Sequence, residues 1–389
     1  MFGDTPLHIV EDASHLAELV EKLESAPVFG VDTESNSMYA YTERVCLIQF
    51  SVIGEDWIVD PLAVEDLSPL GPVLADRSIP KVLHGADYDI RCLHRDYGFR
   101  IHGLFDTLVA AQLLAMPKVG LADLLERFFG LDVDKQFQRH NWAERPLLPD
   151  HLFYARGDTH YLMALREILL RRLEAAGRIA HVEEECLLME KLEFEPRTID
   201  PDDYLRMKGI GKLSDEQMRV LKRVFLFREK EAERVDRPPF KVIPNRTLID
   251  IARKLPDHED DLPLSRRSSI RRKYGKRLLD EVEAGLAETW KVDRRRRTKP
   301  APRKKKEPSR LSGRAADRAM EALKNWRNDL TEQRGYTSHN VVSNSVLKRI
   351  ASARPTTVEE LRNVQDVRNW QAEEFGQLIL DVLNEVDPR

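Results

Sequence analysis

Residues 27–34 read PVFGVDTE, and this stretch indicates the fold of the N-terminal part of the chain. An apolar run leads into two carboxylates, Asp32 and Glu34, at alternate positions. Alternate positions of a strand share one face, so both carboxylates leave the same side of a sheet. Two anions on one sheet face repel each other, and a divalent metal ion would relieve that repulsion. Two solvated acids at the end of a strand are the structural alternative.

Strand and helix patterns alternate outward from this stretch to about residue 180. Further apolar runs predict strands at 45–52, 56–60 and 81–85. Helical periodicity predicts helices over 13–24, 88–97, 104–114, 121–129 and 150–176. Early strands followed by alternating helices and a further strand predict a mixed α/β sheet with helices packed on it.

Two of these predicted helices carry further acids. The stretch HGADYD at 84–89 turns from a strand into a helix, and Asp89 falls in the first helical turn. A helix-capping role for Asp87 or Asp89 is the alternative there. Tyr154 and Asp158 are four residues apart and share one helical face. Gly157 beside them costs a helix interior about 1 kcal/mol relative to alanine, which suggests a close approach of another group.

Together these stretches resemble the ribonuclease D family of the DEDD exonuclease superfamily, in its tyrosine branch. The matching stretches are VDTE (31–34), HGADYDIRCL (84–93), FDT (105–107), NWAERPL (141–147) and YARGDTHYL (154–162). The resemblance implies an RNase H-like exonuclease domain. It also implies metal-binding acids and a catalytic tyrosine, which are carried over to Asp32, Glu34, Asp89, Asp158 and Tyr154. Asp106 in the FDT stretch belongs to the scaffold in this family.

Such a site predicts hydrolysis of phosphodiester bonds with two divalent ions, Mg²⁺ or Mn²⁺. Hard cations prefer oxygen ligands, and two ions about 3.5–4 Å apart can activate a water and stabilise the leaving oxygen. We expect Asp32 to bridge the two ions. Glu34 and Asp158 would complete the ligands of the ion on the side of the attacking water, and Asp89 would hold the other ion through water. Tyr154 would orient the attacking water or act as the base. The resemblance implies nucleoside 5′-monophosphates released from a 3′ end.

After about residue 204 the sequence predicts only helices, in two similar copies. A shift of 99 positions places Asn344 on Asn245, Leu347 on Leu248 and Pro355 on Pro256. Both copies resemble the small helical-bundle domain named HRDC, which bacterial ribonuclease D carries in tandem. The expected organisation is an exonuclease domain (1–180), a helical connector (181–204), a first HRDC domain (205–290), a basic linker (291–311) and a second HRDC domain (312–389).

Composition and charge restrict the class of protein. The chain has 389 residues, 42% of them hydrophobic, and a net charge of −4, which excludes global disorder. Three cysteines without a C-x-x-C pair exclude a disulfide scaffold and a cysteine zinc site. The chain lacks an apolar run of membrane-spanning length. The linker 291–311 has eleven Lys or Arg against two acids, and is either a solvated spacer or a tether for a polyanion.

Several further residues are candidates for holding RNA. Gln49 and His84 lie near predicted strand ends, and a core role is the alternative for both. Trp142 could stack on the strand and Arg145 could contact a phosphate, with packing as the alternative for Trp142. Seven Lys or Arg occur between 266 and 277, and Arg271, Arg272 and Lys273 are taken as RNA contacts in the first helical copy.

The predicted function is a 3′→5′ exoribonuclease in the cytoplasm that trims precursor tRNA or other structured RNA with a 3′ extension. Neither a membrane nor an obligate protein partner is expected. One alternative is a 3′→5′ exonuclease acting on DNA, since the same metal site serves proofreading enzymes. Another is an RNA-binding adaptor with a decayed nuclease site, although the presence of all five site residues argues against it. The basic linker also permits a nuclear-localisation signal.

Overall fold

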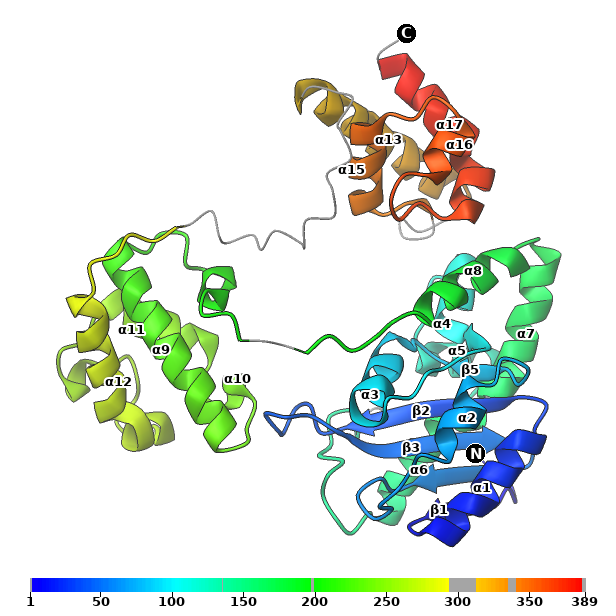
Figure 1. Ribbon diagram of the computed structural model, residues 1–389, viewed down its shortest axis with the longest axis horizontal. Coiled ribbons are helices and arrows are strands. Elements are labelled where there is room, and N and C mark those ends of the chain that lie inside the picture. Colours follow the sequence, from blue (N-terminus) through cyan, green and yellow to red (C-terminus); the bar gives the residue numbers. More distant parts are fainter. Residues whose placement is uncertain (1, 135, 197–198, 294–312, 335–340, 387–389) are drawn as a thin grey trace. The chain divides into compact units, whose positions relative to one another are not determined.

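The computed structural model describes residues 2–134, 136–196, 199–293, 313–334 and 341–386. Contacts divide the chain into two compact units. The first contains the α/β part and the C-terminal group of helices. The second contains the other group of helices together with residues 35–44. Figure 1 shows the α/β part in blue to green and the two groups of helices in green to yellow and in orange to red.

A six-stranded mixed sheet forms the centre of the α/β part, in the order β1-β4-β3-β2-β5-β6. The strands are β1 (Leu7–Val10), β2 (Phe29–Ser35), β3 (Val45–Val52), β4 (Glu55–Val59), β5 (Lys81–Leu83) and β6 (Leu104–Asp106). β3 is antiparallel to β4, whereas β1 is parallel to β4 and β5 is parallel to β2 and β6. Every residue of β3 is buried, which explains its nearly continuous apolar sequence. The predicted mixed sheet is confirmed.

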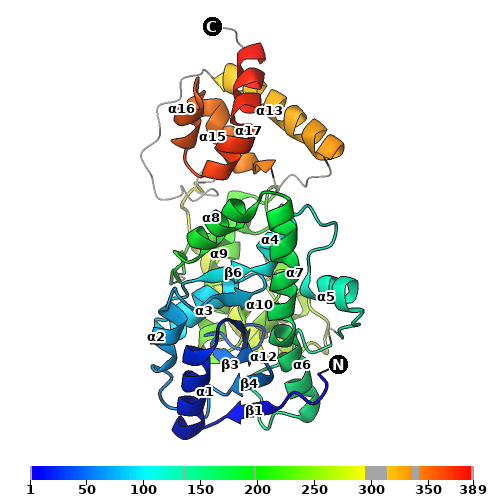
Figure 2. The same ribbon diagram turned by 90° about the vertical axis from the view of Figure 1, so that its right-hand side faces the viewer.

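Helices cover both faces of this sheet (Figures 1 and 2). They are α1 (Ala13–Ser25), α2 (Leu70–Ala75), α3 (Asp87–Tyr97), α4 (Thr107–Leu113), α5 (Leu121–Phe129), α6 (Pro149–His160), α7 (Leu162–Ala175) and α8 (Ile179–Met189). On one face, Leu16 and Leu19 of α1 join the core that contains Phe29 and Val31 of β2. On the other face, α6 packs on β3 and β4. The sheet is therefore the middle layer of three.

Some elements differ from the pattern expected from the sequence. The stretch 104–114 is not one helix, because Asp106 ends β6 and its carboxylate caps α4 by accepting the Leu108 and Val109 amides. The stretch 150–176 contains two helices, which meet at Tyr161. The short elements β1 and α2 were not expected, because four to six residues give too little periodicity to detect.

Two groups of helices follow, and they are copies of one another. The first contains α9 (Asp215–Arg234), α10 (Pro239–Val242), α11 (Asn245–Lys254) and α12 (Ser269–Ala287), and the second contains α13 (Gly313–Arg334), α15 (Asn344–Ala353), α16 (Val358–Arg362) and α17 (Asn369–Val386). α11 and α15 are offset by 99 residues at both ends. Buried Arg228 and Arg327 both donate to a carbonyl 15 residues further on, at 3.3 and 2.9 Å. The predicted duplication is confirmed.

The second unit also holds the segment 35–44, which directly follows Glu34. Asp236, just after α9, accepts hydrogen bonds from the backbone amides of Tyr41 and Thr42 at 3.0 and 3.3 Å. The Lys241 ammonium lies 3.6 Å from the centre of the Tyr39 ring. The first group of helices therefore binds the segment that leaves the D-x-E strand.

The structure places no strand after residue 204 within the part of the chain that it describes. Within that same part, none of the helices has the length and apolar character needed to cross a membrane. Most of the predicted basic linker, residues 294–311, lies outside the described residues.

Candidate active site

β2 places Asp32 and Glu34 on the sheet face that α6 covers. A Cβ added at Gly30 would lie 3.1 Å from the carbonyl oxygen of Thr159, so the strand and the helix approach closely there. Side chains alternate along a strand, so Asp32 and Glu34 follow Gly30 on the same face. A larger residue at Gly30 would push α6 away from the two acids.

A buried hydrogen-bond network fixes α6 on the β3–β4 hairpin. The Asp56 carboxylate, 2% exposed, accepts hydrogen bonds from Arg156 and from His160 Nδ1 of α6. The Ser51 hydroxyl lies 2.6 Å from Asp56 and 2.8 Å from the Thr159 hydroxyl. Burial alone would raise the pKa of Asp56, but the hydrogen bonds from His160, Ser51 and Arg156 hold that pKa below its usual value. The network thus sets the position of the helix that carries the predicted tyrosine and the last acid.

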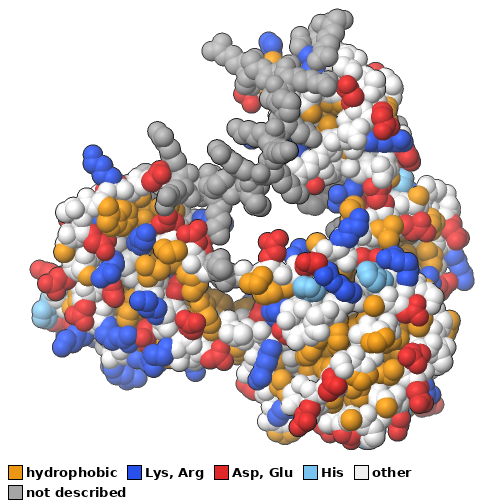
Figure 3. Space-filling view, viewed as in Figure 1, with side chains coloured by type: hydrophobic (Ala, Val, Ile, Leu, Met, Phe, Trp, Pro, Cys, Tyr) orange, Lys and Arg blue, Asp and Glu red, His pale blue; other side chains and the backbone are white. Residues whose placement is uncertain are grey.

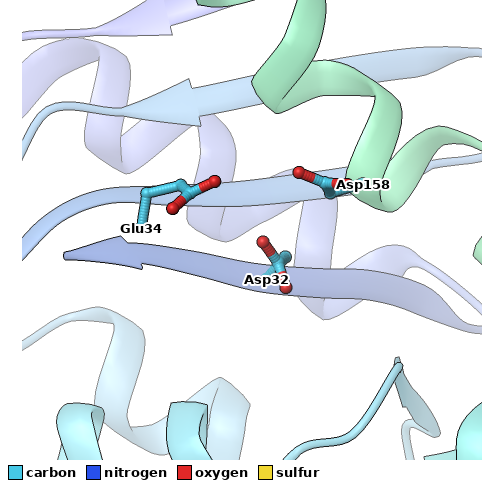
Figure 4. Close-up of side chains that lie close together, drawn as sticks. All are labelled: Asp32, Glu34 and Asp158. Carbon is cyan, nitrogen blue, oxygen red and sulfur yellow. The ribbon is translucent and has the colours of Figure 1, made fainter. Parts of the chain in front are cut away.

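Three of the predicted metal ligands converge at this contact. One carboxylate oxygen from each of Asp32, Glu34 and Asp158 lies within 4.8 Å of the other two. Figure 4 shows the carboxylates of the two β2 residues and of the α6 residue turned toward a common space. Tyr154 lies one turn before Asp158 on α6, and the charges of all three acids act on its phenol. Residues from distant parts of the sequence are therefore neighbours.

Asp89 approaches the same acids from the N-terminal end of α3. Its side chain is 6% exposed, and the Thr33 hydroxyl donates to its Oδ1 at 2.5 Å. Asp89 lies outside the three-oxygen group, but its charge acts on Asp32, Glu34 and Asp158. No pattern in the sequence singles out Thr33, because its role depends on a contact across 56 residues.

Burial and mutual repulsion disfavour the charged forms of these acids. Burial, and then the charge of Asp89, raise the pKa of Asp158 to about 7. Burial raises the pKa of Asp89 to about 6, although the hydrogen bond from Thr33 opposes it. For Asp32 and Glu34, burial and the neighbouring carboxylates raise the pKa well above the usual value. Burial and the same negative charges also raise the pKa of Tyr154 above its usual value.

The donor set fits divalent cations. Carboxylate oxygens from β2 and α6 lie close together, and burial and other carboxylates are the main influences that raise the pKa of Asp32, Glu34, Asp89 and Asp158. Two divalent ions would compensate the repulsion that raises these pKa values. Oxygen-only ligands suit Mg²⁺ or Mn²⁺. Asp32, Glu34 and Asp158 would hold them, with Asp89 beside them.

The other two candidate acids have different partners. Asp87 is largely exposed and pairs with Arg91 at 3.0 Å. Asp106 is fully buried, and its carboxylate accepts the backbone amides of Gly85 and Ala86 at 3.1 and 2.7 Å in addition to capping α4. Asp106 therefore has a scaffold role, as the resemblance implied.

Two of the predicted RNA contacts are engaged within the protein. Trp142 is 1% exposed and packs with Leu47 and Ala155, which favours the packing alternative. The Arg145 guanidinium makes two hydrogen bonds of 2.6 Å to the Asp60 carboxylate and a third, of 3.1 Å, to the Cys46 carbonyl. These contacts tie the segment 141–147 to the sheet.

Gln49 and His84 border the sheet in different ways. Gln49 is fully buried in β3, and neither polar atom of its side chain has a hydrogen-bond partner. His84 is half-buried, its Nδ1 lies 2.9 Å from the Thr107 hydroxyl, and burial lowers its pKa. The surroundings of these two side chains do not by themselves indicate a contact with RNA.

The predicted basic residues of the first group of helices are mostly exposed. Arg272 and Lys273 on α12 are exposed, whereas Arg271 pairs with Asp260 at 2.5 Å. Figure 3 shows Lys and Arg side chains gathered over the region of α12. A second group of basic residues lines an open cavity of about 580 Å³ beside α11, namely Arg206, Lys208, Arg246 and Arg253, together with Asp250, which pairs with Arg246 and Arg253. The sequence did not reveal it because its members are scattered over 48 positions.

Comparison with protein families gives two matches. A family described as 3′-5′ exonuclease matches residues 7–174. The HRDC domain family matches twice, at residues 217–282 and 316–383. The first match contains all five predicted catalytic residues, and the other two correspond to the duplicated groups of helices.

Individual proteins similar to this chain include bacterial and eukaryotic ones. Ribonuclease D of Desulfotalea psychrophila is 31% identical over 257 residues, which are 66% of this chain and 69% of that protein. Exosome complex component 10 of Mus musculus is 35% identical over 262 residues, which are 65% of this chain and 30% of that protein. The match thus spans less than a third of the exosome component.

Two solved structures are similar over most of the chain. The catalytic core of RRP6 from Trypanosoma brucei has a TM-score of 0.68 at 32% identity, and the match covers 74% of this chain and 81% of that one. Escherichia coli RNase D, described as an exoribonuclease involved in structured RNA processing, has a TM-score of 0.67 at 25% identity. That match covers 98% of this chain and 99% of the other.

Proposed function

Because this chain belongs to the ribonuclease D family of DEDD 3′→5′ exonucleases, we propose that it is a 3′→5′ exoribonuclease that releases nucleoside 5′-monophosphates. The observation that carries the proposal is the convergence of Asp32, Glu34 and Asp158 within 4.8 Å. All five residues carried over from the family are present, which argues against the decayed adaptor.

The acids and the tyrosine have separate tasks in this proposal. Asp32, Glu34 and Asp158 would hold two divalent ions, and Asp89 would support them from α3. Such ions, when bound, supply the positive charge that activates water and stabilises the leaving oxygen. Burial and the three neighbouring carboxylates raise the pKa of Tyr154, and bound cations would oppose that rise. The Tyr154 Oη would therefore orient the attacking water through a hydrogen bond or act as the base.

We propose that the substrate is RNA. More narrowly, we propose structured RNA with a 3′ extension, such as precursor tRNA. Similarity to Escherichia coli RNase D over the whole chain supports this, since that enzyme is described as acting in structured RNA processing. The exposed basic residues of the first HRDC domain are suited to phosphates remote from the cleaved bond. Arg272 and Lys273 remain candidates for this contact.

A timed digest tests the activity and the substrate together. Purified protein is incubated with a 3′-extended tRNA, with a matched single-stranded RNA and with the DNA of the same sequence, with Mg²⁺ or Mn²⁺ or with a chelator. We expect nucleoside 5′-monophosphates from RNA only when the metal is present. Faster loss of the DNA would favour the DNA exonuclease. Activity that survives chelation would contradict the metal site.

We further propose that the enzyme works in the cytoplasm without an obligate protein partner. The bacterial ribonuclease D match spans 69% of that protein, whereas the match to the exosome component spans 30% of it. Full activity of the purified chain alone would support this proposal. Activity that appears only after a cell extract is added would contradict it.

A further inference from the structure

Gln49 is a fully buried amide in the middle of β3, and neither its Nε2 nor its Oε1 has a hydrogen-bond partner. Buried polar side chains nearly always have partners in folded proteins, because water no longer solvates them. An unpartnered amide at a central strand position therefore indicates a group that joins the site on binding.

Gln49 faces the same side of the sheet as the acids. The Ser51 hydroxyl on the same strand lies 2.8 Å from Thr159 of α6, and Gln49 is two residues before Ser51, so both point toward α6. The strand β2 is the hydrogen-bonded neighbour of β3. Its Gly30 faces Thr159 on the same side of the sheet, and Asp32, two residues later, lies on that side as well. Gln49 and Asp32 thus lie on neighbouring strands beneath one helix.

The surroundings of Gln49 on β4 and α6 are largely apolar. Its paired neighbour on β4 is Ile58, which belongs with Leu47 and Ala155 to one hydrophobic cluster. That cluster also contains Trp142, whose Nε1 lacks a partner, but an indole N–H can only donate. The carboxylate acceptors that share this face lie on β2.

We propose that Gln49 is a positioning residue of the metal site, whose Nε2 donates a hydrogen bond to the Asp32 carboxylate when divalent ions are bound. An ionised carboxylate has about four lone-pair positions, so it can bind ions and still accept from an amide. Groups of this kind orient metal ligands in many proteins. Full burial separates Gln49 from the path of the RNA. The inference rests on the proposed function, since it requires the metal site.

The test compares metal affinity with the stability of the metal-free protein. Gln49→Met keeps the length of the side chain and removes both polar atoms. We expect the affinity for Mn²⁺, titrated by calorimetry without RNA, to fall about tenfold. We also expect the melting temperature in chelator to stay the same or rise, because the variant no longer buries an unpartnered amide. Gln49→Leu replaces Gln49→Met if the latter does not fold.

Gln371→Met is the matched control, since Gln371 is a buried glutamine on α17, outside the sheet, whose Nε2 donates a hydrogen bond to the Val341 carbonyl at 2.9 Å. It should lower the melting temperature and leave the affinity for Mn²⁺ unchanged. If Gln49→Met binds Mn²⁺ within about twofold of the wild type, the proposal is wrong, whatever the melting temperature. If the wild-type protein itself binds no Mn²⁺, the proposed metal site fails rather than the role of Gln49.

Discussion

At the scale of single residues, the fold builds a cation-binding site by placing like charges close together. These charges are the carboxylates of Asp32, Glu34, Asp89 and Asp158. Asp89 is buried and the other three are half-buried, each interacts electrostatically with at least one other carboxylate, and their pKa values are raised. Such a cluster destabilises the metal-free fold at neutral pH and favours any cation that fills it.

Asp158→Asn should abolish hydrolysis and leave RNA affinity within about threefold, because it removes a metal ligand and not the surface on which RNA docks. The measurement is single-turnover cleavage with Mg²⁺, paired with RNA binding in chelator. Asp150→Asn, an exposed acid at the start of the same helix, is the control and should cleave normally. Normal cleavage by Asp158→Asn would show that the ligands are assigned wrongly.

The raised pKa values predict how the stability of the metal-free protein depends on pH. Asp89 and Asp158 have pKa values of about 6 and 7 in the fold, against 3.8 as the reference value. At pH values between the reference pKa and the raised pKa values, the folded protein binds more protons than the unfolded chain. The free energy of unfolding therefore falls as the pH rises through this range. In chelator, the melting temperature of the wild type should fall relative to Asp158→Asn between about pH 5 and pH 8. Saturating Mg²⁺ should remove this fall.

At the scale of elements, the position of α6 decides the site. Gly30 lets the helix approach β2, and Asp56 holds Arg156 and His160 on either side of Asp158. The segment 141–147, just before α6, is held in a similar way by the bond of Arg145 to Asp60.

Asp60→Asn tests whether Arg145 is structural. Asp60 is 4% exposed and Arg145 is 27% exposed, so loss of this ion pair should lower the free energy of unfolding by about 3 kcal/mol, measured with denaturant. Arg145→Met should cost a similar amount, and neither variant should change RNA affinity by more than about twofold. A larger loss of RNA affinity in Arg145→Met alone would restore the predicted phosphate contact.

At the scale of the whole molecule, a nuclease domain is followed by two copies of one helical module. The copies keep the buried arginine at 228 and 327 and a left-handed residue after α11 and α15, at Leu255 and Arg354. Their surfaces differ, because Arg246 and Arg253 of the first copy correspond to Ser345 and Ser352 of the second, whereas Ile249 and Asp250 correspond to Lys348 and Arg349. The duplication therefore preserved the core and changed the positions of the charges.

Truncation after Val292 should weaken binding to structured RNA and flatten its salt dependence. The removed part contains ten of the eleven basic residues of the linker and the whole second module. Each phosphate that the shorter chain no longer neutralises reduces the slope of log affinity against log salt by roughly one unit. The measurement is RNA affinity at several salt concentrations for the full chain and the truncated chain. An unchanged slope would mean that this part does not contact RNA.

The sequence by itself determined the class of fold and the duplication, and its resemblance to a family predicted the five catalytic residues. Strand and helix periodicity is local, and the spacing of Asp32 with Glu34 or of Tyr154 with Asp158 follows from the geometry of one element. The same local rules failed at 104–114, where Asp106 divides a strand from a helix through bonds to distant amides.

Only the tertiary structure decided which polar residues serve the site and which serve the scaffold. Asp89 and Asp106 look alike in the sequence, yet one is within electrostatic reach of the acid cluster and the other caps a helix. Trp142 and Arg145 were predicted as RNA contacts, and only the fold shows that Trp142 is buried and that Arg145 pairs with Asp60. The physical reason is that burial and charge coupling depend on distances between strands and helices, which no single segment contains.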